Sequence, residues 1–379
     1  MHITAIKRSP LFVPYLRPYY WAHGTITGAQ VVLIEIETDE GLTGYGECIG
    51  SPSLQATCLY IDRVADFLRG HDPFQNASLV ATAYQQVFQA FGTGSSPRFA
   101  ARILAGVEMA LWDIMGKAAR RAVHELLGGA VRSHVEYFGF AQGETAAEVA
   151  ADAVSLVADG FEVIYLKVGR GEDLDVETAR AVRAAIGPDC RLRVDANEHW
   201  SAFQAARMIG RLSSFGIEVV EQPTPSEIAS ALPRVSRRST TPISADQSVF
   251  NSFDVYDVCR AGAVDMIVLG LHETGGILPF VKAASVAEAA GVDVCVHGLY
   301  ETGITTCAAH QAASTVRNLD DANQHMTRFL AWDIVKTPEL RPVHGRLPLM
   351  NGPGLGFEID WDGVDRARVT PDWRPPDIG

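Results

Sequence analysis

The feature that most constrains the fold is a repeat of roughly 26 residues in the second half of the chain. Six short runs rich in β-branched residues are each followed by a stretch compatible with a helix. The residues expected at the strand tips are 28, 26, 25, 24 and 27 positions apart: Lys167, Asp195, Glu221, Asp246, Gly270 and His297. Strands that alternate with helices at such a spacing are typical of parallel strands with crossover helices. Six consecutive units favour a closed barrel over an open sheet, which is expected to change direction partway. The runs span residues 163–169, 191–197, 217–223, 242–247, 264–270 and 292–298.

The first 130 residues predict a separate α+β domain. Alternating apolar residues indicate strands at residues 2–13, 30–38 and 42–49. Helical periodicity follows around residues 54–68 and 73–91, and is strongest over residues 97–119. Near the other end, the Gly/Pro-rich run at 351–356 leads into a short strand. We interpret it as a tail returning to the first domain, a plain surface turn being the alternative.

The composition excludes several classes of partner. Asp and Glu number 45 against 32 Lys and Arg, a formal net charge of −13, and so acidic a chain repels nucleic acid and anionic membranes. We find no basic cluster that would reverse this, no apolar run of about 18 residues that could span a membrane, and no signal peptide. The six cysteines form no Cys-x-x-Cys pair. We expect a cytoplasmic protein without nucleic-acid or membrane partners, and a homo-oligomer.

Three successive strand ends carry a carboxylate: Asp195, Glu221 and Asp246. In a β/α barrel the carboxyl ends of the strands meet at one mouth, where active sites lie. Three carboxylates there repel each other unless a cation lies between them. Oxygen ligands suit a hard cation such as Mg²⁺. We therefore predict an Mg²⁺ site; the alternative, that each carboxylate caps the following helix, explains three in register less well.

Two further strand ends carry groups that transfer protons. Lys167 ends an otherwise buried run, and a neighbouring cation together with removal from water would lower its pKa and make it a general base. A lysine that merely reaches solvent is the alternative. His297 is a candidate acid or base, and Glu301 could orient it or contact the substrate. With Mg²⁺ and Lys167 the three carboxylates sum to zero charge, so an anionic substrate can bind.

Together these motifs resemble the enolase superfamily, specifically its mandelate racemase and muconate lactonizing enzyme branch. The resemblance covers essentially the whole chain: VDAN, VEQP and ADQS match the three metal-ligand strands, and residues 106–129 and the GPGLG at 352–356 are also typical. It implies an α/β fold in which a modified TIM barrel, (β/α)7β, spans residues 131–345. An α+β capping domain (1–130) is completed by the C-terminal segment (346–379).

The resemblance also implies the chemistry. A small-molecule carboxylate substrate binds Mg²⁺, a base removes its α-proton, and the metal stabilises the resulting ene-diolate. Asp195, Glu221 and Asp246 then occupy the ligand positions, and Lys167 matches the second lysine of a Lys-x-Lys pair.

The chain departs from this pattern in three places. Tyr165 replaces the first lysine of the pair, and it becomes a candidate proton donor. Gly270 stands where relatives carry a lysine or an aspartate that pairs with the histidine, so we expect His297 to lack a carboxylate partner. Gln247 stands where Glu or Asn is frequent.

These residues favour β-elimination. A two-base racemase needs proton donors on both faces of the substrate, whereas an elimination needs one base and an acid for the leaving group, which Lys167 and His297 or Tyr165 can supply. We predict an Mg²⁺-dependent lyase that dehydrates a hydroxy acid or sugar acid. A racemase, epimerase or cycloisomerase of a small carboxylate is the second choice.

The first domain should cover the substrate. Residues 15–25 are expected to form a loop, and its Tyr20, Trp21 and His23 are candidate substrate contacts. As a lid, this loop would suit a partly apolar substrate better than an open polyol; an aromatic surface loop without a role in binding is the alternative.

Two other classes of protein are alternatives to this lyase or isomerase. A metal-dependent barrel hydrolase would usually need a His-x-His pair, which none of the eleven histidines forms. A catalytically silent relative that binds carboxylates fits the changes at Tyr165 and Gly270, but the intact set of metal-ligand candidates argues against it.

Overall fold

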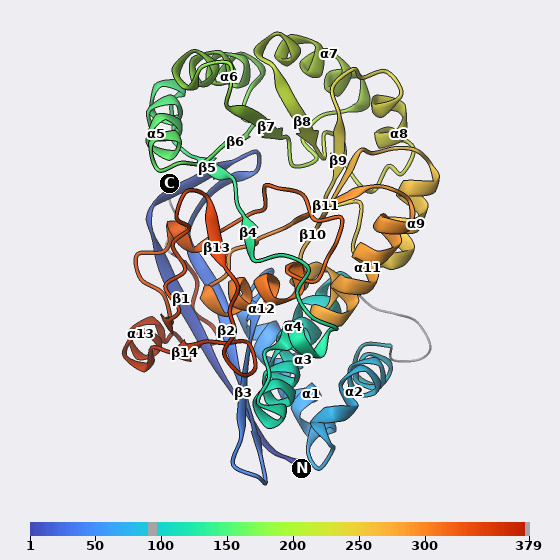
Figure 1. Ribbon diagram of the computed structural model, residues 1–379, viewed down its shortest axis with the longest axis vertical. Helices are drawn as coiled ribbons and strands as arrows, with labels where there is room; N and C mark the ends of the chain where they lie inside the picture. Colours follow the sequence, from blue (N-terminus) through green and yellow to red (C-terminus); the bar gives the residue numbers. More distant parts are fainter. Residues whose placement is uncertain (90–96, 376–379) are drawn as a thin grey trace.

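The computed structural model describes residues 1–89 and 97–375. A long antiparallel hairpin, drawn in blue in Figure 1, runs along one side of the molecule and ends beside the barrel. Its strands pair with a third to give the order β1-β2-β3. The sheet comprises β1 (Ile3–Trp21), β2 (Gly24–Thr38) and β3 (Thr43–Ile49).

The hairpin corrects one prediction, because residues 15–25 do not form a loop. Tyr19 pairs with Ile26 and Trp21 with Gly24, so β1 and β2 continue to a tight turn after an irregularity beyond Pro14. Gly24 at the turn has φ +127°, a conformation that only glycine adopts easily. The segment is therefore extended, and its side chains alternate between two faces.

Helices cover one face of this sheet. Those expected over residues 54–68 and 97–119 are confirmed as α1 (Leu54–Leu68) and α3 (Pro97–Ala119). The stretch expected from residue 73 is divided into a short 3₁₀ turn, α2 (Asn76–Ala83) and a π-helical turn over Tyr84–Phe88. Its last two residues, 90 and 91, lie outside the described residues. Apolar side chains of β2, α1 and α3 form one core cluster.

The second region is a curled parallel sheet in the order β11-β10-β9-β8-β7-β6-β5, with helices on its outside (Figure 1). All six strands expected from the repeat are present. The strands are β5 (Gly139–Ala141), β6 (Val163–Lys167), β7 (Arg191–Asp195), β8 (Ile217–Glu221), β9 (Ile243–Ala245), β10 (Met266–Leu269) and β11 (Asp293–Val296). The intervening helices are α5 (Ala146–Ala158), α6 (Glu172–Ile186), α7 (Ala202–Leu212), α8 (Ala231–Ser236), α9 (Ser252–Arg260), α10 (Leu271–Thr274), α11 (Ile277–Ala289) and α12 (Gly303–Ala313).

An irregular segment, residues 318–324, closes the sheet. On one side the amide of Gln324 donates to Val296 O of β11 at 3.0 Å, and on the other the amide of Phe138 donates to Asn323 O at 3.0 Å. This segment follows α12 and takes the place of the last strand. The expected modified barrel, (β/α)7β, is confirmed.

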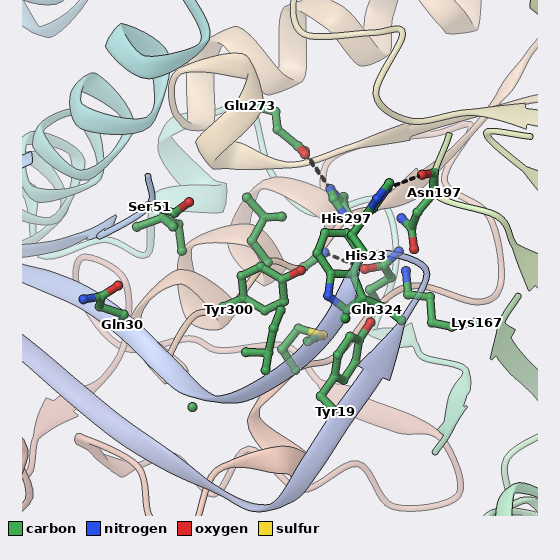
Figure 2. A pocket seen from close by; sticks show the side chains of 18 of the residues that line it. Tyr19, His23, Gln30, Ser51, Lys167, Asn197, Glu273, His297, Tyr300 and Gln324 are labelled. Atoms are coloured by element: carbon green, nitrogen blue, oxygen red, sulfur yellow. Dashed lines mark hydrogen bonds and ion pairs between the residues drawn. The ribbon is translucent and has the colours of Figure 1, made fainter. Parts of the chain in front are cut away.

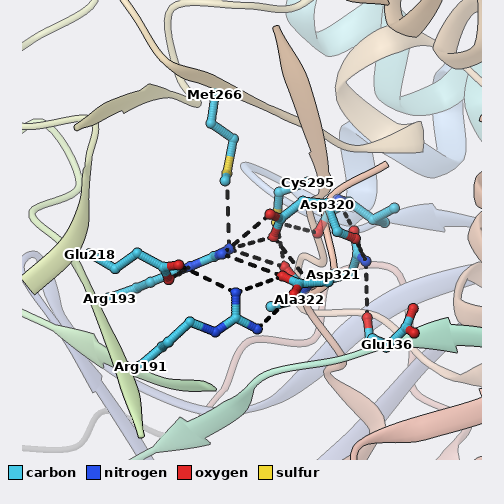
Figure 3. A network of polar contacts seen from close by, with 11 residues as sticks. Glu136, Arg191, Arg193, Glu218, Met266, Cys295, Asp320, Asp321 and Ala322 are labelled. Carbon is cyan, nitrogen blue, oxygen red and sulfur yellow. Dashed lines mark hydrogen bonds and ion pairs between the residues drawn. The ribbon is translucent and has the colours of Figure 1, made fainter. Parts of the chain in front are cut away.

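Alternation along the strands decides which side chains enter the barrel. On β7, Leu192 and Val194 pack outward against the helices, while Arg193 lies inside and is 3% exposed. Arg193 donates to Glu218 at 2.7 Å and to Asp320 at 2.6 Å. Arg191 forms a two-pronged contact with Asp321 at 2.8 and 2.9 Å (Figure 3). We call these five residues the basal ion-pair network.

Buried carboxylates join the two regions. Glu108 of α3 accepts hydrogen bonds from the amides of Ile277 and Leu278, the first residues of α11, at 2.7 and 3.0 Å. Glu47 of β3 accepts from the amide of Thr302 at 3.0 Å, just before α12. Each carboxylate satisfies amides at a helix N-terminus that would otherwise lack partners. The first region is thereby held in place above the strand ends.

The remaining segment runs back across the first region. It contains β12 (Val335–Thr337), β13 (Arg346–Pro348), β14 (Glu358–Ile359) and α13 (Trp361–Ala367); α4 (Val123–Leu126) and β4 (His134–Glu136), which precedes β5 and pairs with β13, complete the elements. Beyond α13, the amide of Val369 donates to Pro10 O of β1 at 3.0 Å. Among the described residues, no helix is both long and apolar enough to cross a bilayer.

Candidate active site

A cavity of about 820 Å³ lies where the carboxyl ends of the barrel strands meet the tip of the β1–β2 hairpin. Figure 2 shows Tyr19 and His23 from the hairpin facing Lys167, Asn197 and His297 from the barrel. Because strand, helix and hairpin all contribute, both regions of the molecule enclose it. Its lining includes Tyr19, Trp21, His23, Gln30, Ser51, Arg98, Arg102, Lys167, Asn197, Glu198, Gln247, Phe250, Glu273, His297, Tyr300 and Gln324.

Lys167 lies at the cavity wall and bonds to its neighbour on the next strand. Its Nζ donates to Asp195 Oδ2, and the two side chains are 6% and 0% exposed. Burial acts to lower the pKa of Lys167, but Asp195 and Glu221 outweigh it, so the pKa is raised. The lowered pKa expected from the sequence assumes a cation beside the lysine; the carboxylates alone act in the opposite direction.

The three predicted metal ligands lie on or just after adjacent strands. Asp195 ends β7, Glu221 ends β8, and Asp246 follows β9; all three are buried. Burial raises the pKa of Glu221 well above its usual range, and repulsion from Asp195 and Asp246 raises it further. Burial likewise raises the pKa of Asp246. Anionic groups so close together in a dry site favour a positive partner.

The donor atoms test whether Mg²⁺ fits. Among the described residues, Glu221 Oε1 and both carboxylate oxygens of Asp246 are buried without a hydrogen-bond partner. Asp195 has its two oxygens engaged, by Lys167 and by the amide of Asn197 at 2.7 Å. Buried carboxylate oxygens without donors are costly unless they coordinate a cation. Three such oxygens from two neighbouring strand ends fit an Mg²⁺ ion.

A second group of candidate ligands overlaps the first. One donor atom each from Asp246, Glu273 and His297 lie within 4.8 Å of one another, a spacing that could hold a metal. However, His297 Nδ1 already bonds to both oxygens of Glu273, at 2.7 and 2.8 Å. This nitrogen is therefore not free to coordinate a metal, and we interpret His297 and Glu273 as a hydrogen-bonded pair.

The expectation that His297 lacks a carboxylate partner is wrong. Glu273 comes from α10, three residues beyond the strand end at Gly270, and Figure 2 shows its carboxylate pointing at the imidazole. A Cβ at position 270 would lie 2.3 Å from Glu273 Oε2. Gly270 therefore leaves the space that the Glu273 carboxylate occupies. The bond at Nδ1 leaves Nε2 as the ring nitrogen available to a molecule in the cavity.

Tyr165 and Glu301 are buried but do not line this cavity. Tyr165 lies inside the barrel, stacked on Phe138 with ring centroids 4.3 Å apart, and its ring is 5.3 Å from Lys167 Nζ. It forms part of the layer beneath the lysine. Glu301 accepts from the amide of Leu299 at 3.0 Å and is 3.9 Å from His272. Glu273, and not Glu301, is the carboxylate that holds His297.

The hairpin tip separates the predicted contacts by strand alternation. Trp21 and His23 line the cavity together with Tyr19. Tyr20 is on the opposite face, where the Arg170 guanidinium lies 5.1 Å from its ring, so the structure does not bring it to the cavity. His23 Nε2 lies 2.7 Å from Asn197 O, which ties the tip to the end of β7.

Several lining residues were missed by the sequence analysis. Glu273, Asn197 and Tyr300 each follow a strand end by two to four residues, so residues of the loops after the strands also reach the cavity. Arg102 comes from α3, whose strong apolar periodicity gave no reason to examine its polar face. Glu273 is the fourth residue after β10, so the first four residues after each strand are the signal that would have indicated it.

Comparison with known proteins identifies the family. Residues 5–128 match the mandelate racemase / muconate lactonizing enzyme N-terminal domain, and residues 148–363 match the enolase C-terminal domain-like family. The chain belongs to the mandelate racemase and muconate lactonizing enzyme branch of the enolase superfamily. The resemblance inferred from the motifs is thus confirmed, and the chain is an enzyme of this superfamily, whose matched members are lyases and isomerases.

The relatives catalyse different reactions. The chain is 30% identical to D-galactarolactone cycloisomerase of Agrobacterium fabrum over 97% of its own length and 99% of the relative. It is 28% identical to D-galactonate dehydratase of Xanthomonas oryzae, over 91% and 93%. A dipeptide epimerase from Cytophaga hutchinsonii, solved with Mg and D-Ala-L-Val, superposes with a TM-score of 0.90 at 26% identity, covering 97% and 99%. The superfamily chemistry is shared, and the specific reaction is not fixed by these identities.

Proposed function

We propose that this chain is an Mg²⁺-dependent dehydratase of a hydroxy acid or sugar acid. The observation that carries the proposal is that Lys167 and the Glu273–His297 pair face one cavity from different strands, beside the three carboxylates. A base and an acid that reach one substrate are the requirement for β-elimination. Asp195, Glu221 and Asp246 would hold the metal.

The cavity lining supports a substrate that carries hydroxyl groups. Among the described residues, Asn197 Oδ1, Gln247 Oε1 and Gln324 Nε2 are buried without a hydrogen-bond partner. Buried polar atoms without partners cost free energy, and those that line a binding site are explained by bonds to the ligand. Two acceptors and one donor of this kind match a polyhydroxy acid, although the hairpin aromatics alone had favoured a more apolar substrate.

The chain's own residues then divide the work. Lys167, deprotonated, would take the α-proton, and the electron pair of the broken C–H bond would expel the β-hydroxyl. His297 would donate its Nε2 proton to that hydroxyl, which leaves as water; the enol product then rearranges to a keto acid. Glu273 would hold the imidazole ring in place through Nδ1 and stabilise its charged form. When bound, Mg²⁺ would stabilise negative charge on the substrate carboxylate.

Racemisation or epimerisation is the second candidate, and one observation favours it. His297 is a partnered imidazole, so it could return a proton to the face opposite Lys167 as well as protonate a leaving group. The two reactions use the same residues and differ in whether the substrate has a β-hydroxyl to lose.

Proton exchange in D₂O tests the proposal. The protein would be incubated with Mg²⁺ and a panel of hydroxy, sugar and amino carboxylates, with exchange and products followed by NMR. Formation of a keto acid is the expected result. Exchange with inversion but without a keto acid would replace the dehydratase with a racemase, and no exchange with any acid would support a silent carboxylate-binding protein.

Metal removal gives a separate prediction. Mg²⁺ at 100 times its Kd should stabilise the folded protein by about 2.7 kcal/mol, measured as the free energy of unfolding with and without EDTA. Asp246→Asn should remove most of this increase. Asp62→Asn, which changes an exposed partner of Arg8 far from the site, is the matched control. Full Mg²⁺ affinity in Asp246→Asn would contradict the three-carboxylate site.

A further inference from the structure

Two arginines of α3 line the cavity. Arg98 and Arg102 are one helical turn apart on α3, so they lie on the same face of the helix. Arg98 donates to Gln247 O at 3.0 Å, and its guanidinium lies 4.0 Å from the Phe250 ring centroid. Arg102 donates to Ser51 O at 3.5 Å. Both contacts are to neutral groups.

The carboxylates of the cavity are otherwise engaged. Glu273 bonds to His297, and Glu198 accepts from the amide of Ser226 at 2.6 Å. Within residues 1–89 and 97–375, neither arginine comes within 4.0 Å of an acidic oxygen. Arg102 Nε is in addition buried without a hydrogen-bond partner. Arg102, which is partly buried, thus lacks the counter-charge that such a guanidinium ordinarily has, and Arg98 at the same wall is exposed.

Arg102 lies at the far end of the cavity from Lys167. It contacts Ser51, and Figure 2 shows Ser51 and Gln30 on the other side of Tyr300 from Lys167 and Asn197. Tyr300 is influenced by both ends: burial raises its pKa, while Lys167 and Arg102 each act to lower it. A substrate whose reacting carboxylate lies at the metal would extend its other end past Tyr300 toward Arg102.

The charges of the two ends differ. At the metal end, the three carboxylates, a bound Mg²⁺ and Lys167 in its protonated form would sum to zero charge. At the far end the two guanidinium groups leave positive charge unmatched. The planar guanidinium presents N–H groups in a fork that fits a carboxylate or a phosphate, and it is not deprotonated near neutral pH.

We propose, resting on the proposed function, that the substrate carries a second anionic group, a carboxylate or a phosphate, which Arg102 binds with support from Arg98. The substrate class is then a hydroxy diacid or a phosphorylated hydroxy acid rather than a singly charged one. Arg102 determines specificity and takes no part in the proton transfers.

Matched acids test this. In D₂O with Mg²⁺, kcat/KM for α-proton exchange would be compared between aldaric acids and the aldonic acids of the same configuration, such as galactarate with galactonate. A phosphorylated aldonate forms the third arm. We expect the diacid or the phosphorylated acid to exceed the aldonate at least 100-fold in the native chain, and the favoured arm identifies the anion.

Variants separate charge from fold. Arg102→Gln should bring the ratio of dianion to monoanion to within about threefold of one, and Arg102→Lys should retain part of the preference. Arg121→Gln, which alters an exposed arginine paired with Glu125, should leave the ratio unchanged. A native ratio near one, or equal losses for both acids in Arg102→Gln, would overturn the second-anion site while leaving the dehydratase standing. Absence of exchange with every acid would instead overturn the proposed function.

Discussion

Strand β7 carries buried charge at both ends of the barrel, and the two ends treat it differently. Arg193, the middle residue of the strand, meets Glu218 and Asp320 within 2.7 Å. Asp195, two residues further on, belongs to a set of three carboxylates. Their cationic contacts among the described residues are Lys167, which bonds to Asp195, and His297, whose Nδ1 lies 3.4 Å from Asp246 Oδ1. The basal arginines meet acidic partners within the protein, whereas the three carboxylates at the mouth outnumber the cationic side chains that contact them.

The difference separates charge that serves the fold from charge that serves a ligand. A buried ion pair with all of its partners tolerates the interior, and removing one partner costs several kcal/mol. Carboxylates without partners raise the energy of the folded chain and are retained where an added ion or substrate repays that cost. Substitutions at the two ends should therefore have effects of different kinds.

The largest effect is expected at Lys167. Lys167→Ala should lower solvent-deuterium incorporation at the α-carbon by at least about 10³-fold, or some 4 kcal/mol of transition-state stabilisation, because it removes the proposed base. NMR of an accepted substrate in D₂O measures it. Mg²⁺ binding, followed by calorimetry, should persist; retained exchange in this variant would remove Lys167 as the base.

Next in size is the loss of the basal ion-pair network. Arg193→Met should lower the free energy of unfolding by about 3 kcal/mol, since it strands the buried Asp320 beside Glu218. Urea unfolding measures this, and Asp320→Asn in the same chain should recover part of the loss. Exchange activity per folded molecule should be unchanged. If Arg193→Met were as stable as the native chain, the contrast between the two ends would fail.

A smaller, more selective effect is expected at Glu273. Glu273→Gln should slow elimination about 10–100-fold, because the imidazole loses the charge that supports its protonated form. Exchange by Lys167 should fall less, so the ratio of elimination to exchange is the measurement.

A double variant controls for structure at this position. Gly270→Asp with Glu273→Ala moves the carboxylate to the strand end, close to His297, in space that Glu273 vacates. Partial recovery of elimination is expected. Equal losses of both reactions in Glu273→Gln would instead assign this glutamate to the fold alone.

The smallest effect is expected at Glu221, and it has the opposite sign to that at Arg193. Because the pKa of Glu221 is raised in the folded protein, the folded state holds this proton more tightly than the unfolded state, and its stabilising effect is lost as pH rises. Glu221→Gln should therefore stabilise the metal-free protein at pH 8 by about 1 kcal/mol. Thermal unfolding from pH 5 to 8 in EDTA should show a shallower decline in the variant. A destabilised Glu221→Gln would mean that the carboxylates at the mouth have partners within the protein, as the charged residues of the basal ion-pair network do.

The repeat predicted the barrel because each barrel strand is buried on both faces. Such a strand is a nearly continuous apolar run, which can be located directly in the sequence. Only the tip of the hairpin, residues 15–25, was predicted wrongly. Pro14 and Pro18 suggest a break in the strand, but the two strands pair again from Tyr19 after an irregularity in register. The three carboxylates were found because they lie at strand ends. Glu273 was not, because its contact depends on the short helix α10 and on the missing side chain at Gly270. Tyr165 shows the converse: its position in the motif suggested chemistry, but its ring is packed inside the barrel.

The tip of the β1–β2 hairpin has a consequence for how such proteins diversify. Trp21 and His23 reach the cavity from a segment 174 residues away from the Asn197 carbonyl that His23 meets. Neither side chain belongs to a strand of the barrel, and His23 is exposed to solvent. If Trp21 and His23 contact the substrate as proposed, mutations in these few codons would alter which molecule is accepted while the proton-transfer groups and the folding of the barrel stay constant. Substrate selection and proton transfer would then depend on different segments of the chain and could evolve separately.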